Sequence, residues 1–197
     1  APALLMTAGI SVASEEFTYP VMAGFKWRRL YFGPNASPIS SPQIVTGTIL
    51  GALLRIVIVV VVYFAVLVIF GAVPNLATGW LLMPIGALAA LSFGLPLMAY
   101  AASLEHDSGQ FALVQRFIFM PMFLFSGTFY PLANLPIWLQ WVGWISPLWH
   151  ASELGRAVSY DKPIEPWLMA VHLGYLLVLS VGAFLIARRI FTRRLAQ

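Results

Sequence analysis

The chain has 197 residues, of which 60% are hydrophobic and 9% are charged, and its formal net charge is +4. A soluble domain is about half apolar and about a quarter charged, so this composition excludes an ordinary soluble protein and predicts a polytopic membrane protein. The absence of cysteine excludes disulfides, thiolate metal sites and a cysteine nucleophile.

Five apolar segments are candidates for membrane spans, because a helix needs about 20 mostly apolar residues to cross a bilayer. They are residues 1–24, 44–70, 79–104, 111–130 and 167–187. The chain opens inside an apolar stretch with no basic region before it, which predicts a further N-terminal portion. We therefore expect an all-α membrane protein, a polytopic helical bundle with five visible spans and a sixth in the full chain.

Basic residues lie mostly in the loop 25–43 and after the last span, and basic residues near span ends prefer the cytoplasm. This set consists of Lys26, Arg28, Arg29, Arg188, Arg189, Arg193 and Arg194, against Arg156 and Lys162 on the other side. We therefore expect the loop 25–43, the link 105–110 and the C-terminus to face the cytoplasm. Topology explains the basic residues, so no nucleic-acid partner is expected.

The segment 127–165 cannot form a straight span, because its prolines remove backbone donors and break helices. Its tryptophans supply rings that settle at the level of the lipid headgroups. We expect a broken, partly re-entrant extracytoplasmic hairpin. Its candidate residues are Trp138, Trp141, Trp144, His150, Glu153 and Arg156. Glu153 and Arg156 are three residues apart and suited to pair on a short helix, whereas His150 and His172 are interpreted as lone structural histidines.

Four charged residues fall inside expected spans, where a charge is costly and usually faces protein or water. One of them, Arg116, is near the cytoplasmic end of its span, where snorkelling is sufficient. Glu15 and Glu16 are expected on the cytoplasmic half of the first span, facing a cavity or the coupling loop, with Lys26 or Arg29 as candidate partners. The alternative is that the span ends before Glu15 and both carboxylates are solvated. Arg55 is expected to pair with a buried acid or carbonyl.

The span 111–130 carries a stripe of aromatic, methionine and polar residues that helical spacing puts on one face. The stripe consists of Phe111, Gln115, Phe119, Met122, Phe123 and Ser126. Such a face offers an adaptable surface to an amphipathic substrate. Ordinary packing or lipid-facing aromatic residues are the alternative interpretation.

Three segments in this order resemble the type-2 ABC exporter permeases, in the branch of the nodulation-factor exporter and daunorubicin-resistance permeases. They are EEFTYPVMAGFKWRRLYFGPNASPISSPQIVTG at 15–47, the FSGTFYP and LPIWLQ block at 125–140, and PLWHASELGR ending at residue 156. The resemblance implies six spans per protomer, two protomers (identical or different) and two ATP-binding subunits on the cytoplasmic face. It also implies that an amphipathic helix and a first span precede this chain.

With this resemblance, the segment 25–32 is interpreted as the contact with the ATPase subunit. A short helix that docks into a cleft needs apolar anchors and basic rim contacts. The candidate residues are Phe25, Lys26, Trp27, Arg28, Arg29 and Leu30. Topological charge combined with aromatic interface anchors is the alternative.

The sequence lacks the G-x-x-x-x-G-K-[ST] pattern, so ATP and Mg²⁺ are expected in the partner, with no cofactor in this chain. No catalytic set converges, and the contiguous Glu105, His106 and Asp107 are interpreted as a solvated loop rather than a metal site. We expect a permease that exports a lipid-linked saccharide, a glycolipid or a hydrophobic drug across the bacterial plasma membrane, in contact with membrane lipid. A lipid-modifying membrane enzyme and a non-transporting scaffold subunit are the alternatives.

Overall fold

The computed structural model describes residues 2–160 and 163–196, and these ranges contain helices and no strand. The prediction of an all-α protein is therefore confirmed. The helices are α1 Pro2–Glu16, α2 Tyr19–Phe25, α3 Phe32–Asn35, α4 Ser41–Ile69, α5 Leu76–Gly79, α6 Leu82–Ser103, α7 Gln110–Val114, the π-helical turn η1 Gln115–Phe119, α8 Met120–Phe125, the 3₁₀ turn η2 Leu132–Asn134, α9 Ile137–Trp144, α10 Pro147–Tyr160 and α11 Pro166–Leu195.

Three helical stretches in the described residues are long and apolar enough to cross a membrane. They are Ser41–Ile69, Leu76–Ser103 and Pro166–Leu195. The stretch Gln110–Phe125 is apolar but shorter. Helix α1 has 15 residues, and after a short interruption of the helix the chain continues as α2. These helices occupy the expected positions of the five spans, and the number of spans stays a prediction.

The first expected span is interrupted between α1 and α2 by a proline. Pro20 lies in the first turn of α2, where it has no N–H to donate to the carbonyl of Glu16 and would clash with that carbonyl in a continuous helix. Thr18 bridges the break by donating its hydroxyl to the carbonyl of Ser14 at 2.7 Å. The junction at Phe17 and Thr18 therefore separates two rigid helices.

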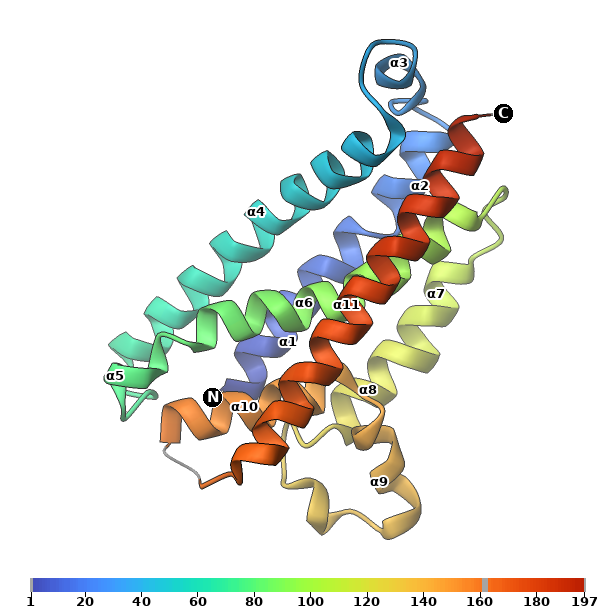
Figure 1. Ribbon diagram of the computed structural model, residues 1–197. Helices are drawn as coiled ribbons and strands as arrows, with labels where there is room; N and C mark the ends of the chain where they lie inside the picture. Colours follow the sequence, from blue (N-terminus) through green and yellow to red (C-terminus); the bar gives the residue numbers. More distant parts are fainter. Residues whose placement is uncertain (1, 161–162, 197) are drawn as a thin grey trace.

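Helix α6 forms the centre of the bundle and packs against α1, α4, α10 and α11 (Figure 1). In its most apolar window 56% of the residues are buried, compared with 17% in α4 and 22% in α11. Small residues such as Gly86, Ala89, Ala90 and Gly94 give α6 a close approach to α1. α4 and α11 therefore leave most of their apolar surface for lipid or for other protein.

Gly94 of α6 packs closely against Ala13 of α1 and against Phe17, and its replacement by valine is expected to destabilise the bundle. A Cβ at Gly94 would overlap the ring of Phe17 and lie 2.9 Å from Cβ of Ala13. Overpacking of this kind costs about 1–3 kcal/mol. Thermal unfolding in detergent should show a clearly lower midpoint for Gly94→Val. Gly182→Val on α11 is the matched control, because nothing lies within 4 Å of its Cβ; an equal loss in both would contradict the packing argument.

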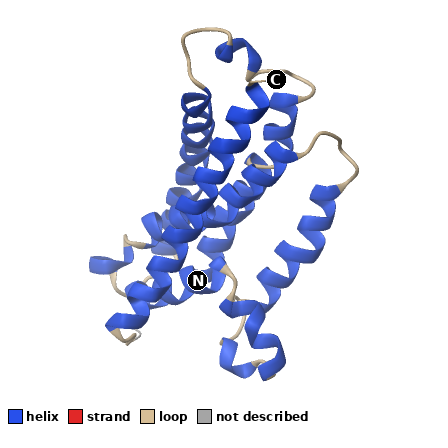
Figure 2. Ribbon diagram, turned by 45° about the vertical axis from the view of Figure 1, so that its right-hand side comes forward, coloured by secondary structure: helices blue, strands red, loops and turns tan. Residues whose placement is uncertain are grey.

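The loops separate to two ends of the molecule. α3 and the C-terminal end of α11 lie at one end, and α5, α9 and α10 lie at the other (Figures 1 and 2). At the first end Asn35 donates its side-chain N–H to the carbonyl of Leu195 at 3.0 Å, and Arg194 donates to the carbonyl of Ala102 at 2.7 Å. The loop 25–43, the end of α6 and the C-terminus therefore share one end, as the charge pattern predicts; which side of the membrane it faces stays a prediction.

Candidate functional site

An exposed turn that carries basic and apolar side chains lies at the basic end; it is formed by residues 26–30 and is here called the basic turn. All five of its residues are exposed. Trp27 is 54% exposed and Leu30 is 57% exposed, although both are large and apolar. Lys26, Arg28 and Arg29 surround them with positive charge. Large apolar side chains presented beside cations are typical of a surface that anchors a protein partner.

An aromatic cluster holds the basic turn in place. The buried ring of Phe25 packs edge-on against Tyr31 and Phe191, with centroid separations of 4.8 and 4.7 Å. The guanidinium of Arg194 lies 4.5 Å from the centroid of the Phe25 ring. Any side chain at Gly24 would collide with the ring of Tyr31. Burial raises the pKa of the Tyr31 phenol, so this ring stays neutral inside the cluster.

The structure corrects two expectations for this segment. No helix runs through residues 25–32, because α2 ends at Phe25 and α3 begins at Phe32, and Arg29 has a left-handed φ of 50° between them. Phe25, expected as an outward anchor, is buried and 4% exposed. Aromatic and basic residues alternate here, and this pattern does not distinguish the aromatic side chains that point inward from those that point outward. The outward set is therefore the basic turn alone.

A polar cleft of about 350 Å³ lies between the junction of α1 with α2 and the start of α7. Ser14, Glu15, Thr18 and Gln115 supply its polar lining. The hydroxyl of Ser14 donates to Oε1 of Gln115 at 3.4 Å, which joins the two walls. One wall contains the proline break, and the other contains the π-helical turn η1, a feature often found at functional sites. Both walls of the cleft are therefore irregular at the same place.

The two adjacent carboxylates have different surroundings. Glu16 pairs with Arg55 of α4 at 2.5 Å, which supplies the partner that the sequence could not identify for Arg55. The sequence had suggested Lys26 or Arg29 as the partner of these carboxylates, but the partner of Glu16 is Arg55. Glu15 lines the polar cleft and makes no ion pair with any residue in the described ranges. Adjacent helix positions diverge by about 100°, so one carboxylate faces α4 and the other faces α7.

The pair formed by Glu16 and Arg55 is expected to stabilise the contact between α1 and α4. Arg55→Leu leaves Glu16 without this partner among apolar helices, and about 1–2 kcal/mol should be lost, since Arg55 is 66% exposed. The double variant Glu16→Leu with Arg55→Leu should recover most of that loss, because no lone charge remains. Thermal unfolding of the wild type, of Arg55→Leu, of Glu16→Leu and of the double variant in detergent measures the coupling. Additive losses in the double variant would contradict an interaction between the two side chains.

The predicted substrate stripe on α7 and α8 mostly faces the protein interior. Phe119 and Met122 are 7% and 5% exposed, and the buried Ser126 donates to Oγ of Ser146 at 2.7 Å. Phe123 packs edge-on against Phe129, and Phe111 and Gln115 line the polar cleft. The π-helical turn adds one residue to the helix, and Phe119, Met122 and Ser126 still share the buried side of this segment. The role of the stripe in a substrate path stays a prediction.

The opposite face of this segment lines a larger apolar groove of about 570 Å³. Phe117, Ile118 and Pro121 form one wall, and Trp141 and Tyr175 contribute from α9 and α11. This groove could not be predicted from the sequence, because its walls come from four separate parts of the chain. A groove of this size and apolar character suits a hydrocarbon chain.

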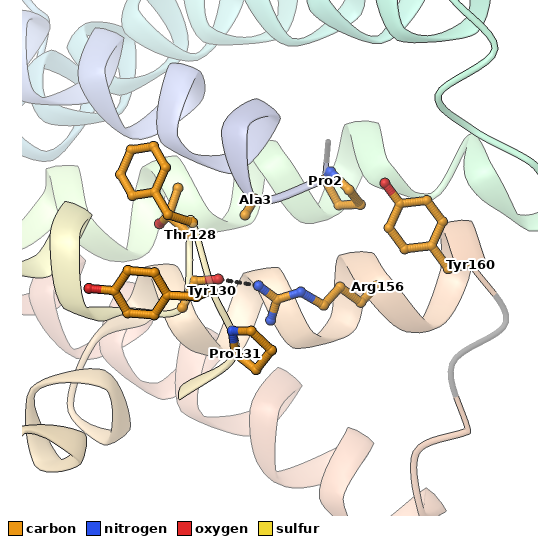
Figure 3. Close-up of a pocket in the computed structure, with 9 residues that line it drawn as sticks. Pro2, Ala3, Thr128, Tyr130, Pro131, Arg156 and Tyr160 are labelled. Atoms are coloured by element: carbon orange, nitrogen blue, oxygen red, sulfur yellow. Dashed lines mark hydrogen bonds between the residues drawn. The ribbon is translucent and has the colours of Figure 1, made fainter. Parts of the chain in front are cut away.

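At the other end of the molecule, Arg156 fastens the loop after α8 to α10. It donates to the carboxylate of Glu153, as the spacing predicts, and to the carbonyl of Gly127 (Figure 3). Gly127 has a φ of 74°, a backbone conformation that glycine adopts without strain. Nearby α9 exposes Trp138, Trp141 and Trp144, which are 67%, 54% and 48% exposed.

The two histidines interpreted as lone residues lie against each other. His150 of α10 and His172 of α11 are 5% and 4% exposed, and their Nδ1 atoms are 2.7 Å apart. They are separated by 22 positions on two different helices, so no spacing rule pointed to the contact.

The chain is similar to known proteins of one family. The profile of the ABC-2 type transporter family matches residues 2–160. The chain is 25% identical over 206 residues to nodulation protein J of Rhizobium leguminosarum bv. viciae, covering 100% of this chain and 74% of that protein. It is 27% identical over 162 residues to the probable multidrug ABC transporter permease YbhR of Escherichia coli K12, covering 80% of this chain and 42% of that protein.

A eukaryotic relative is also similar. ABC transporter G family member 20 of Dictyostelium discoideum is 29% identical over 180 residues, covering 90% of this chain and 23% of that protein. The chain therefore spans less than half the length of two of these three relatives. No solved structure shows a significant match to it.

Proposed function

Because the chain belongs to the ABC-2 type transporter family, we propose that it is the permease subunit of an ATP-driven exporter that moves an amphipathic substrate across a bacterial plasma membrane. The permease relatives and the long apolar helices make it a multi-pass membrane protein of an ABC transporter. ATP and Mg²⁺ bind to a partner subunit in this proposal, and the chain contributes the path. The complete transporter contains two ATPase subunits and two permease protomers, identical or different.

The observation that carries the proposal is the basic turn. Trp27 and Leu30 are exposed at the end of the molecule where the basic residues lie, which is the end expected in the cytoplasm. Side chains of this kind bury well in a cleft of a partner, where a few aromatic anchors supply most of the binding energy. The aromatic cluster beneath them holds the turn firmly enough to transmit a displacement.

The junction between α1 and α2 offers a route from the basic turn to the polar cleft. Phe17 and Thr18 are the only residues between α1 and α2, and α2 leads directly from them to the buried Phe25. When the ATPase subunits close, a push on the basic turn tilts α2 against α1 at this junction. The cleft lined by Glu15 and Gln115 changes shape in the same movement, since one of its walls is the junction itself.

The lining of the two cavities supports an amphipathic substrate. The polar cleft presents a carboxylate, hydroxyls and an amide to a headgroup, and the larger groove presents aromatic and aliphatic side chains to a hydrophobic part. A lipid-linked saccharide, a glycolipid and a hydrophobic drug all have this character. The extracytoplasmic hairpin, with its exposed tryptophans, covers the outer end of the path at the level of the headgroups.

Purification of the tagged full-length protein in mild detergent tests the proposal. We expect a subunit with a Walker motif to co-purify in equal amount, with ATP hydrolysis that vanadate inhibits. Recovery of the permease alone under several detergents, with lipid-modifying activity or with none, would overturn the proposal in favour of a membrane enzyme or a scaffold subunit.

A further inference from the structure

The contact between His150 and His172 links the extracytoplasmic hairpin to the last helix. The Nδ1 atoms are 2.7 Å apart, and both side chains are buried. The ring of Tyr175 stacks on His150 with centroids 4.1 Å apart, and the ring of Trp149 lies 4.9 and 5.0 Å from the two imidazoles. A hydrogen bond between two imidazoles requires one Nδ1 to donate and the other to accept.

The surroundings of His150 determine which nitrogen donates. Its Nε2 lies 2.9 Å from the carbonyl of Trp144, and a carbonyl only accepts, so Nε2 carries a hydrogen. Neutral His150 therefore has a bare Nδ1, which accepts from Nδ1–H of His172. If His150 becomes charged, its Nδ1 also carries a hydrogen, and the contact persists only when His172 is neutral and accepts.

From this geometry we propose that His150 and His172 form a proton-binding site between α10 and α11, which holds one added proton with the contact intact and separates when a second is added. With two protons added, both rings are cationic and two N–H groups face each other across 2.7 Å. Repulsion of like charges and the loss of an Nδ1 acceptor for either N–H group then act together to separate the rings. The site goes beyond the proposed transport function and does not depend on it.

The other charged and titratable groups on α10, on α11 and on the helices packed against them are as follows. On α10 Glu153 and Arg156 pair with each other. On α11 Tyr175 donates its hydroxyl to the carbonyl of Ile145 at 2.5 Å. The helices that pack on α10 and α11 carry Glu15, Glu16, Arg55, Tyr63 and Tyr100, and the ends of α10 and α11 carry Tyr160, Glu165 and the four arginines from residue 188 onward. Asp161 and Lys162 lie outside the described residues.

Burial favours the neutral ring and lowers the pKa of His150; the carbonyl of Trp144 opposes this shift, and His172 adds to it. The pKa of His150 in the folded protein is thus below that of the unfolded chain, near 6.5. The unfolded chain then binds more protons between these two values. The stability contributed by the neutral ring is complete above about pH 6.5 and is lost as the pH falls through the folded pKa.

Nuclear magnetic resonance of the full-length protein, labelled with ¹⁵N-histidine in lipid nanodiscs, tests the proposal directly. The chain has three histidines, and the third, the exposed His106, is the internal reference. At pH 8 we expect His150 protonated on Nε2 and bare on Nδ1. On acidification, the pair should titrate in two steps at least about one pH unit apart. Independent single titrations of His150 and His172, or a bare Nε2 on His150, would overturn the proposal.

Thermal unfolding between pH 7.5 and 5.0 gives a second readout. The unfolding midpoint of the wild-type protein and of His106→Gln should fall by about 3 °C or more over this range. The reason is that the unfolded chain takes up a proton at His150 at a higher pH than the folded protein does, so acid stabilises the unfolded state. His150→Gln with His172→Gln should lack this acid-dependent fall, whatever its stability at pH 7.5. The same fall in the double variant would assign the acid sensitivity to other groups and contradict the proposal.

Discussion

Replacing Trp27 and Leu30 together by alanine is expected to abolish the coupling of ATP hydrolysis to this permease. The two side chains are the exposed apolar members of the basic turn, and neither contributes to the aromatic cluster beneath it. A hot-spot anchor of an interface contributes about 2 kcal/mol or more, so the loss of a single anchor weakens binding about 30-fold. The loss of both should reduce ATPase subunit recovery and permease-dependent hydrolysis by at least that factor. Insertion and thermal unfolding of the permease should remain unchanged.

The matched control lies at the opposite end of the molecule. Ile137 and Trp138 of α9 are 72% and 67% exposed, so Ile137→Ala with Trp138→Ala removes similar apolar surface far from the basic turn. This variant should retain the ATPase subunit. If both double variants lost hydrolysis equally, or if the Trp27 and Leu30 variant kept it, the basic turn would not be the coupling contact.

Arg156→Gln is expected to cause the largest loss of stability among single substitutions in the hairpin. Arg156 and Glu153 are 19% and 14% exposed, and Arg156 also fixes the carbonyl of Gly127. Removing one member of a largely buried pair costs about 3 kcal/mol, because the remaining carboxylate loses a charged partner in poorly solvated surroundings. Thermal unfolding in detergent measures the change, and protease cleavage near residue 127 should accelerate.

Two further variants identify the cause of that loss. Arg116→Gln removes a positive charge from an exposed position and should leave the unfolding midpoint nearly unchanged. Glu153→Gln with Arg156→Gln removes both charges of the pair and should be more stable than Arg156→Gln alone. A double variant at least as damaged as the sum of the single variants would show that the ion pair contributes no coupling energy.

The helical architecture and the distribution of loops followed from composition and charge. Apolar blocks such as 44–70 are long and poor in charge, which favours membrane helices. The basic residues of the loop 25–43 share one end with the C-terminal end of α11. The pair of Glu153 and Arg156 was also predictable, because its spacing of three residues lies within one helix. These features depend on local sequence or on simple sums of charge.

Features that depend on distant segments could not be predicted. Arg55 and Glu16 are 39 positions apart, and nothing in either segment identifies the other as its partner. The π-helical turn at Gln115–Phe119 also leaves no signal in the regular spacing of the apolar residues. Phe25 and Trp27 are both aromatic residues beside a basic residue, and only tertiary packing decides that one is buried and the other exposed.

Photo-crosslinking from the basic turn tests the proposed coupling contact most directly. A photoreactive amino acid at position 27, or at position 138 as the control, is incorporated into the full-length permease in cells, and the products are identified by mass spectrometry. We expect position 27 to crosslink to a Walker-motif ATPase subunit and position 138 to give no such product. Crosslinks from position 27 to lipid alone, in cells where the permease co-purifies with an ATPase, would contradict the assignment of the basic turn as the coupling contact.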